Sequence, residues 1–559
     1  MTNAAFPRPA PPVPVSLGTV SGWLHGDGTR GILMCGAAGF EAMSVYQGWR
    51  VLADILAARG YSVLRIDYPG EGDSGDRSAA FAAEAMAALR AAGDLLHKLT
   101  GQPIDVVSLR LGAVLAEVAF ENDPRIARRV MLAPVASGRI FLRETKLAAQ
   151  IFASQPGRET TLAEAGVSLC GHELDQADCA SIETLRYPPP ADGDVLAVLP
   201  DGPAAPDLPA LTTRLTFPGY GAMLSPAEAV PPLETFTAIA DWLGPADGQR
   251  LTAPEPATPI AGPGFVEERL RFGPENRLVG TWCRPANRKT GCCVILPNAG
   301  ANPRFGWARM SVMHARALAR QGLASLRFDL SGLGDSDWTG QSPRKALYTL
   351  AHLDNMDAAI ALVSGRGAER ITLAGLCSGG HLALHAADRN PAVTGVVAVN
   401  VLKIIWRQGV DDLDTIERAA PQASRHYAQQ ALSSSYWKRL FSGEIALSRI
   451  LAVGGMLVKK RIDAVLARLG WERPLSPESQ AARALIRRLA SRGTSLSFVY
   501  GTLDASRDEA ERHFGSDGRF LAALPGVTTT FIDDTDHELT PKHARDRLEV
   551  ILADRALNS

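Results

Sequence analysis

Short apolar runs alternate with helical stretches along the chain. Residues 32–39 and 294–300 are apolar and end in glycine, and each precedes a helical stretch that closes on glycine, at residues 57–60 and 317–322. Strand, helix and strand follow one another in this order in each part of the chain. The alternation predicts an α/β protein whose mostly parallel sheets carry helices on both faces.

The same pattern occurs twice. Residues 64–74, LRIDYPGEGDS, return as residues 326–336, LRFDLSGLGDS, after 262 positions. Residues 108–112, SLRLG, align with residues 375–379, GLCSG, after 267 positions. Several elements in one order at nearly one spacing are not expected by chance. The sequence therefore predicts two tandem domains of the same fold.

A stretch rich in proline and glycine separates the two halves. It runs through residues 244–264 and has the composition of a linker. The next residues, 266–272, alternate between apolar and polar as a strand does. We therefore expect a first domain at 1–245, a linker at 246–263 and a second domain at 264–559.

The composition is that of an ordinary globular protein, with 46% hydrophobic and 21% charged residues. Its 559 residues exceed what one hydrophobic core supports. A net charge of −1 gives no general attraction to nucleic acid or to an anionic membrane. Because the chain opens without a signal-like apolar segment and has no apolar run long enough to span a membrane, we expect a cytoplasmic protein.

The cysteines do not suggest a scaffold or a metal centre. There are seven, an odd number in a large chain, which argues against a disulfide framework. Cys170 and Cys179 flank His172, but they lack the C-x-x-C spacing typical of a structural zinc site. Neither a metal nor another cofactor is expected.

The most specific signal is the GLCSG sequence at residues 375–379. It follows an apolar run at 371–374 and precedes a helical pattern at 380–387, which predicts a strand, a sharp turn and a helix. Glycines permit such a turn because its backbone is strained and lies close to neighbouring elements. The turn would lift its central side chain, the thiol of Cys377, above the sheet, where it could act as a nucleophile.

This turn and the D-x-x-G-x-G-D-S pattern of both halves resemble the serine-aminopeptidase/lysophospholipase-like branch of the α/β-hydrolase superfamily. The resemblance covers nearly the whole chain, once per half, and implies two tandem α/β-hydrolase domains. The cysteine at the turn is similar to that of dienelactone hydrolases and polyhydroxyalkanoate synthases. The superfamily order of nucleophile, acid and histidine implies Asp504, after the strand-like residues 496–500, and His537, after residues 528–532.

The chemistry of such a site needs a thiolate, an imidazole that stabilises it and a carboxylate that orients the imidazole. It also needs backbone N–H groups aimed at the developing oxyanion. The resemblance implies that Ser378 and Ala299 provide them, with Asn298 beside Ala299 for substrate binding. The loop of Ala299 departs from the family, because it lacks the usual His-Gly.

Other interpretations of these residues stay open. Asp508 is a second candidate for the acid, and Asp536 could make only local hydrogen bonds. His381 and His385 are one helical turn apart, as metal ligands can be, but without an H-E-x-x-H pattern we expect them to pack or to face solvent. Cys377 itself could be a small core residue, as buried cysteines usually are.

The first half lacks this catalytic set. Arg110 stands where the second half has Cys377, and Ala222 stands where the family has its histidine, so that only Asp201 keeps the position of the acid. We expect a degenerate, structural half that covers a face of the active one. Two alternatives remain: Arg110 binds a carboxylate or phosphate of a ligand, or it pairs with Asp201.

An insertion at about 402–494 falls where α/β-hydrolases carry a lid. Within it, residues 418–473 hold ten Lys or Arg against three Asp or Glu. This segment is either a solvated face, a rim for an acidic carrier or a contact with a membrane surface. A nucleic-acid partner is not expected, because aromatic stacking residues are not evident among the basic ones.

The sequence as a whole predicts an acyl-transfer enzyme, either a hydrolase or an acyltransferase. It would act on an ester or thioester through an acyl group held on Cys377, and coenzyme A or an acyl carrier protein could carry the substrate. The alternative is a non-catalytic two-domain binding protein built on a hydrolase fold. Reactivity of the thiol would separate the two.

Overall fold

The structure is a computed structural model that describes residues 10–155, 158, 166–188, 193–201, 213–226, 229–287, 290–338, 340, 347–349, 351–407, 410–411 and 474–559. Most of the candidate lid lies outside these residues. Contacts divide the chain into two units, Met1–Gln155 with Glu159–Glu369, and Pro156–Arg158 with Arg370–Ser559. The first unit therefore contains most of the first repeat (residues 1–245) and the opening strands of the second repeat (residues 264–559).

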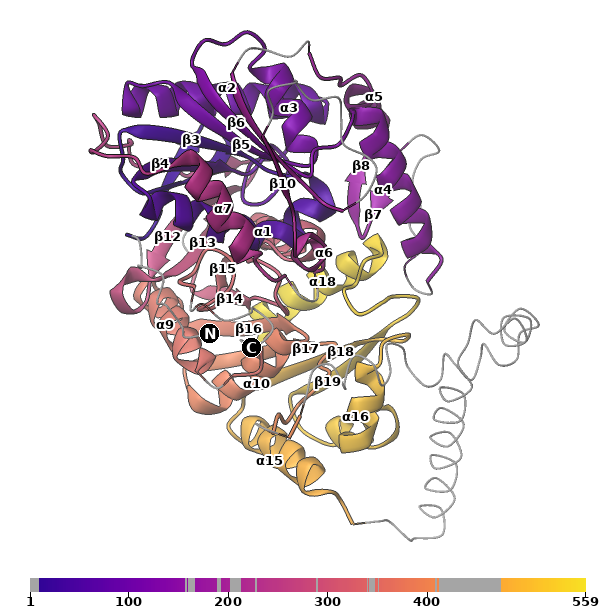
Figure 1. Ribbon diagram of the computed structural model, residues 1–559. Helices are drawn as coiled ribbons and strands as arrows, with labels where there is room; N and C mark the ends of the chain where they lie inside the picture. The colour runs from indigo at the N-terminus through magenta and orange to yellow at the C-terminus, as the bar shows by residue number, and fades with distance from the viewer. Residues whose placement is uncertain are drawn as a thin grey trace, which may run out of the picture. The chain divides into compact units, whose positions relative to one another are not determined.

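Eight strands of the first repeat form one sheet, in the order β1-β2-β4-β3-β5-β6-β9-β10 (Figure 1). Both pairings of β2 are antiparallel and the remaining pairings are parallel. These strands are β1 Val13–Leu17, β2 Val20–His25, β3 Arg30–Cys35, β4 Tyr61–Ile66, β5 Ile104–Leu109, β6 Ile126–Leu132, β9 Asp194–Leu199 and β10 Thr213–Thr216. A separate antiparallel pair consists of β7 Val167–Leu169 and β8 His172–Leu174.

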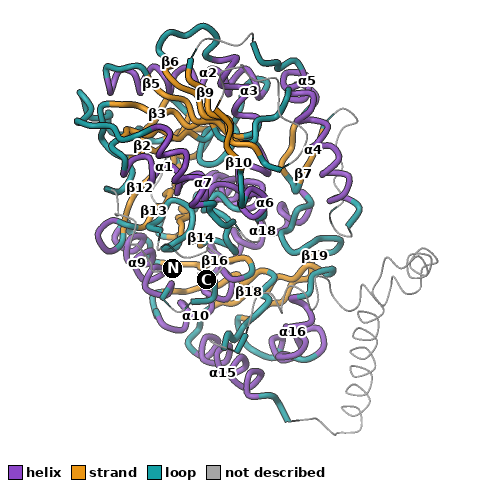
Figure 2. Tube along the Cα trace, in the orientation of Figure 1, coloured by secondary structure: helices purple, strands orange, loops and turns teal. Residues whose placement is uncertain are grey.

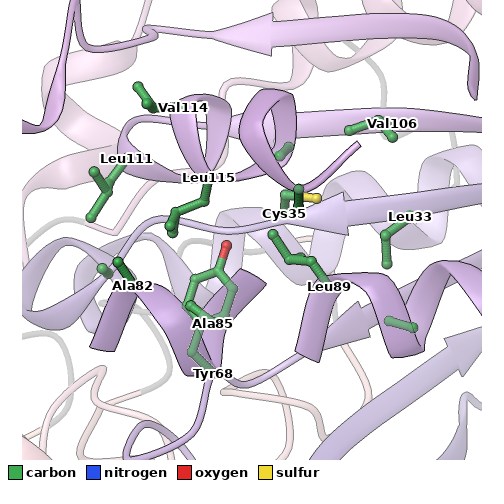
Figure 3. Close-up of a cluster of buried hydrophobic side chains, with 14 of the residues drawn as sticks. Leu33, Cys35, Tyr68, Ala82, Ala85, Leu89, Val106, Leu111, Val114 and Leu115 are labelled. Atoms are coloured by element: carbon green, nitrogen blue, oxygen red, sulfur yellow. The ribbon is translucent and has the colours of Figure 1, made fainter. Parts of the chain in front are cut away.

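Helices cover both faces of this sheet (Figure 2). They are α1 Gly39–Ala58, α2 Phe81–Thr100, α3 Leu111–Ala119, α4 Gly138–Ala153, α5 Gln176–Glu183, α6 Tyr220–Leu224 and α7 Leu233–Leu243. Successive residues of a strand point to opposite faces. Leu33 and Cys35 of β3 accordingly join a core with α2 and α3, which Figure 3 shows, whereas Ile32 and Met34 join a core with α1 and α7.

The second repeat contributes strands to each unit. In the first unit the order is β11-β12-β13-β15-β14, with antiparallel pairs up to β15 and a parallel pair of β14 with β15. In the second unit β16, β17, β18 and β19 pair in parallel in this order. The strands are β11 Ile260–Gly262, β12 Phe265–Phe272, β13 Leu278–Pro285, β14 Cys292–Pro297, β15 Ala324–Asp329, β16 Arg370–Leu376, β17 Val393–Val399, β18 Ser495–Gly501 and β19 Val527–Ile532.

Helices again lie between the parallel strands. They are α8 Met310–Arg320, α9 His352–Gly365, α10 Ser378–Arg389, α15 Pro477–Ser491, α16 Ser506–Phe514, α17 Arg519–Ala522 and α18 Lys542–Asn558. The structure thus confirms the predicted fold class, an α/β chain with mostly parallel sheets flanked by helices, in two tandem repeats. The linker and domain boundaries inferred from composition stay a prediction. Among the described residues, no helix combines the length and the apolarity that crossing a membrane requires.

The D-x-x-G-x-G-D-S pattern forms the same loop in both repeats. In the first, Asp67 Oδ2 accepts the backbone N–H of Asp73 at 2.9 Å, and the Asp67 carbonyl accepts the Ser74 hydroxyl at 2.7 Å. Asp329 makes the two equivalent hydrogen bonds in the second, at 2.9 and 2.5 Å. The second glycine of each pattern has a φ of 48° or 49°, and a Cβ there would lie within 2.3 Å of the aspartate carboxyl carbon. The pattern therefore encodes a loop that the first aspartate holds closed.

Each of these two loops contacts an arginine of the other repeat. Arg65 of β4 pairs with Asp335 at 2.5 Å, and Arg327 of β15, its equivalent in the second repeat, pairs with Asp73 at 3.0 Å. All four side chains are buried. The same contact is made in both directions, as in an interface with two-fold symmetry.

The helices that precede these loops repeat the exchange. Arg50 of α1 donates to the carbonyl of Ser336 at 2.7 Å, and Arg316 of α8 donates to the carbonyl of Ser74 at 3.1 Å. Apolar side chains of α1 pack with others that lie just before α8. Inside the first unit, therefore, equivalent surfaces of the two repeats face each other.

Arg304 stands outside this reciprocity. Arg304 lies in the loop between β14 and α8, is fully buried, and contacts both Asp73 at 2.5 Å and Asp335 at 2.8 Å. Burial alone would raise the pKa of Asp73, but Arg304 and Arg327 outweigh it and hold that pKa well below its ordinary value. The contact between the repeats is thus a network of buried ion pairs.

Candidate active site

The GLCSG sequence forms the predicted sharp turn between β16 and α10. Cys377 precedes α10 with φ 54° and ψ −119°, a strained conformation for a residue with a side chain. A Cβ on Gly375 would lie 2.2 Å from the backbone of Gly379, and a Cβ on Gly380 would lie 2.7 Å from the carbonyl oxygen of Gly375. The glycines are therefore required by close backbone contact. The turn leaves Cys377 half-buried, whereas the other six cysteines of the chain are buried.

The first repeat keeps the same turn without the thiol. Arg110 precedes α3 with φ 55° and ψ −121°. Its backbone N–H donates to the carbonyl of Leu132, at the end of β6, as that of Cys377 donates to the carbonyl of Val399, at the end of β17. The strained backbone is thus a property of the fold in both repeats, and only the side chain at its centre differs.

The guanidinium of Arg110 pairs with two carboxylates of its own repeat. It lies 2.9 Å from Glu41 and 2.6 Å from Glu144, whereas Asp201 is exposed. The pairing that we considered with Asp201 is therefore replaced by these two glutamates. They already balance the charge of Arg110, and ligand binding by this residue stays a prediction.

Asp504 and His537 meet as the superfamily order implies. Asp504 follows β18 and is buried, and its Oδ2 lies 2.8 Å from Nδ1 of His537, which sits in the loop after β19. The other oxygen of Asp504 accepts the backbone N–H of Ser506 at 3.0 Å. The side chain of Cys377 interacts electrostatically with the imidazole of His537 and raises its pKa. The structure therefore brings the three candidate residues together in one chain of contacts.

The charges of this group reinforce one another. Burial alone would lower the pKa of His537, but Asp504 and Cys377 outweigh burial and raise that pKa well above its usual value. Burial alone would likewise raise the pKa of Asp504, and the charge and hydrogen bond of His537 reverse this and lower it. The electrostatics favour a charged imidazole between a carboxylate and a thiol.

Asn400 is a residue of this site that the sequence analysis missed. It is fully buried after β17, at a φ of 44°, and its Nδ2 donates to the carbonyl of His537 at 2.8 Å. Its Oδ1 accepts the backbone N–H of Gly501, at the end of β18, at 2.8 Å. One side chain thus ties the loop of the histidine to the strand that leads to Asp504. The signal was a polar residue interrupting the apolar run at 396–401.

The alternative acid lies elsewhere. Asp508 is in the first turn of α16, and the hydrogen bond of the imidazole goes to Asp504. Asp536 accepts the backbone N–H of Thr540 at 2.8 Å and its hydroxyl at 2.9 Å, which are local hydrogen bonds of the kind we considered. Asp536 therefore helps to hold the histidine loop in shape.

The predicted oxyanion residues lie in different units. Ser378 is the first residue of α10 and is buried, so its backbone N–H is part of the helix start next to Cys377. Asn298 and the half-buried Ala299 follow β14 in the first unit. Asn298 Nδ2 donates to the Asn302 carbonyl and to Asp329, and its Oδ1 accepts the Leu330 N–H. These contacts give its amide a structural role, and substrate binding by Asn298 and an oxyanion contact of Ala299 stay predictions.

The histidines of α10 pack inside the fold. His381 Nδ1 lies 2.9 Å from the carbonyl oxygen of Lys403, and His385 Nε2 lies 3.0 Å from that of Ile404. Burial lowers the pKa of His381 to about 3, so its ring is neutral. Within the part of the chain that the structure describes, no three His, Cys, Asp or Glu side chains are grouped to hold a metal ion.

Comparisons with known proteins add a list of distant structural neighbours. No protein-family profile and no curated protein matches the chain. An esterase of Pyrococcus furiosus is 13% identical with a TM-score of 0.32, covering 52% of this chain and 90% of its own. A proline iminopeptidase of Mycobacterium smegmatis (15%, 0.30, 52% and 99%) and an α/β serine hydrolase homologue from Coxiella burnetii (13%, 0.29, 51% and 96%) are similar. At these scores, the fold assignment depends on the sheets and turns of this chain itself.

Proposed function

We propose that this chain is an acyl-transfer enzyme of the hydrolase type, with Cys377, His537 and Asp504 as its catalytic residues. The observation that carries the proposal is the imidazole of His537, which hydrogen-bonds to Asp504 at 2.8 Å and whose pKa is raised by both Asp504 and Cys377. A half-buried thiol on a strained turn, paired with a charged imidazole, has the properties of a nucleophile rather than of a core cysteine.

The reaction would proceed through an acyl group on sulfur. The thiolate of Cys377 attacks the carbonyl carbon of the ester or thioester, and the oxyanion that forms accepts backbone N–H groups, among them that of Ser378. As the carbonyl re-forms, the bond to the leaving alkoxide or thiolate breaks, and the imidazolium of His537 gives that group its proton. His537, now neutral, takes a proton from water or from an acceptor, which attacks the acyl group and releases the thiolate again.

The substrate class is an ester or a thioester, and the product depends on what reaches the acyl group. Water gives hydrolysis, and an alcohol, amine or thiol gives transfer. We expect coenzyme A or an acyl carrier protein as the carrier of a thioester substrate, because the basic residues at 418–473 suit an acidic carrier. These residues lie outside the described part of the chain.

A second candidate is a binding protein without turnover. The observation in its favour is the first repeat, in which the strained turn persists although Arg110 and two glutamates occupy its centre. The fold therefore keeps this turn without a thiol at its centre. If the second repeat were equally inactive, Cys377 would be unreactive.

The test is the intact mass of the protein after incubation with a panel of acyl thioesters and p-nitrophenyl esters. We expect one added acyl group and turnover, and we expect Cys377→Ala to abolish both. Cys292→Ala, which removes a buried thiol, is the matched control and should label as the wild type does. An unlabelled wild-type protein, or full turnover by Cys377→Ala, would refute the mechanism.

A further inference from the structure

The loop that carries His537 receives a residue from the first repeat. Arg158 follows α4 in the sequence, yet its contacts place it in the second unit. Its Nε lies 3.2 Å from Oδ2 of Asp536, and its Nη2 lies 3.9 Å from Oε2 of Glu538. Arg158 therefore contacts the carboxylates on both sides of the candidate catalytic histidine.

These two carboxylates are poorly solvated. The side chain of Asp536 is 5% exposed and that of Glu538 is 21% exposed. Burial raises the pKa of both groups, and the negative charges of Asp536 and Asp504 raise that of Glu538 further. The positive charge of Arg158 lowers the free-energy cost of holding these two carboxylates near a third, that of Asp504.

The loop itself is tightly folded. Asp534 and Leu539 have φ values of 49° and 55°, so the chain turns back on itself on either side of His537. Asn400 holds the His537 carbonyl, and Asp504 holds the imidazole. The guanidinium of Arg158 is a third restraint, and it acts on the flanking side chains.

We propose that Arg158 is a positioning residue for His537, supplied to the active site by the repeat that has lost its own nucleophile. It holds the loop at 533–540 and neutralises Asp536 and Glu538, so that Asp504 and Cys377 set the charge state of the imidazole. The proposal rests on the proposed function, since it concerns the same histidine. It gives the first repeat a part in the chemistry of the second.

The electrostatic consequence has a definite direction. The titratable or charged groups that the structure brings to His537 are Asp504 after β18, Cys377 before α10, Asp536 and Glu538 in its own loop, and Arg158. Removing the positive charge of Arg158 leaves more negative charge near the thiol. The alkylation rate of the variant should therefore rise at higher pH than that of the wild type.

The experiment is the pH dependence of alkylation by iodoacetamide in the full chain. Cys377 is the half-buried thiol, so intact mass reports its reaction alone. Arg158→Gln keeps hydrogen-bond donors without the charge, and it should move the pH of half-maximal rate upward by about half a unit or more. Arg158→Lys keeps the charge and should restore the wild-type profile.

A matched control is Arg125→Ala. The side chain of Arg125 is 33% exposed, against 26% for Arg158. Like Arg158 it pairs with two carboxylates, but these are Asp94 and Asp123 of its own repeat. It should leave the profile unchanged.

Three outcomes are distinct. A wild-type profile for Arg158→Gln, or an equal shift for Arg158→Gln and Arg158→Lys, would overturn the role of Arg158. If His537→Ala and Asp504→Asn also left the profile unchanged, the proposed function itself would fail. A shift for Arg158→Gln that Arg158→Lys reverses would establish the role by charge.

Discussion

Removing one carboxylate from the buried network between the repeats should strongly destabilise the protein. Asp73 is 1% exposed and contacts Arg304 at 2.5 Å and Arg327 at 3.0 Å, and both arginines are buried as well. Asp73→Asn keeps the shape of the side chain and removes one of the buried negative charges that balance Arg304 and Arg327, which keep Asp335 and Glu267 as partners. Breaking a buried ion pair from one side costs about 3–5 kcal/mol. Because both arginines keep other carboxylate partners, we expect a loss at the lower end of that range, about 3 kcal/mol, in the free energy of unfolding.

Asp76→Asn is a matched control three residues along the same loop. Asp76 contacts Arg309 and Arg316, each at 2.8 Å, but its side chain is 63% exposed. Its arginine partners are mostly buried, but Arg316 keeps Glu267 at 2.6 Å and water screens the Asp76 carboxylate, so we expect Asp76→Asn to cost only about 0–1 kcal/mol. Urea unfolding of both variants, followed by far-ultraviolet circular dichroism, gives the comparison.

The pH dependence of Asp73 has a sign that can be checked. Its pKa is lowered in the folded state, so its contribution is present above the unfolded pKa of about 4 and is lost as the pH falls below it. The difference between wild type and Asp73→Asn should therefore shrink in acid. Equal midpoints for Asp73→Asn and Asp76→Asn at neutral pH would contradict the reasoning that the network stabilises the contact.

Three further outcomes are expected. Asp504→Asn should keep the fold and lower turnover by about 10²–10⁴-fold, because His537 loses its orienting charge. Asp508→Asn should leave kcat/KM unchanged, and the reverse result would move the acid to Asp508. Asn400→Ala should lower kcat about tenfold or more with little change in KM, since it frees the histidine loop; an unchanged kcat would make Asn400 purely structural. Burial raises the pKa of Glu71 to about 7, so the wild type should lose stability as the pH rises from about 5 to 7, and Glu71→Gln should remove this slope in urea midpoints.

The fold and the core of the site could be predicted from the sequence, because they depend on local patterns. The GLCSG turn needs glycines at fixed positions, and the strand exits place Asp504 and His537 in a known order. Alignment of the two repeats is likewise enough to show that Arg110 and Ala222 stand at the positions of the nucleophile and the histidine in the first repeat.

The remaining contacts could not be predicted, because they join distant parts of the chain. In the sequence, Asn400 looks like a residue that ends a strand. Only the structure shows that it links the loop of His537 to the end of β18. Arg65 and Arg327 read as polar positions in apolar strands, and their partners lie 270 and 254 residues away. Arg158 meets Asp536 across 378 residues. Charge pairing of this kind leaves no periodic signal in the sequence.

The single Arg304 shows what fusion of the two repeats makes possible. It lies in a loop of twelve residues between β14 and α8, where the first repeat has only residues 36–38 between β3 and α1. In a dimer of two identical chains every substitution appears twice, and two such arginines would crowd the same pair of aspartates with like charges. Tethering in one polypeptide keeps the partner at high effective concentration and lets each copy change alone. One repeat can therefore carry Arg110 at its strained turn and the other Cys377, and one central cation can serve a pair of aspartates that two identical chains would have to share with two.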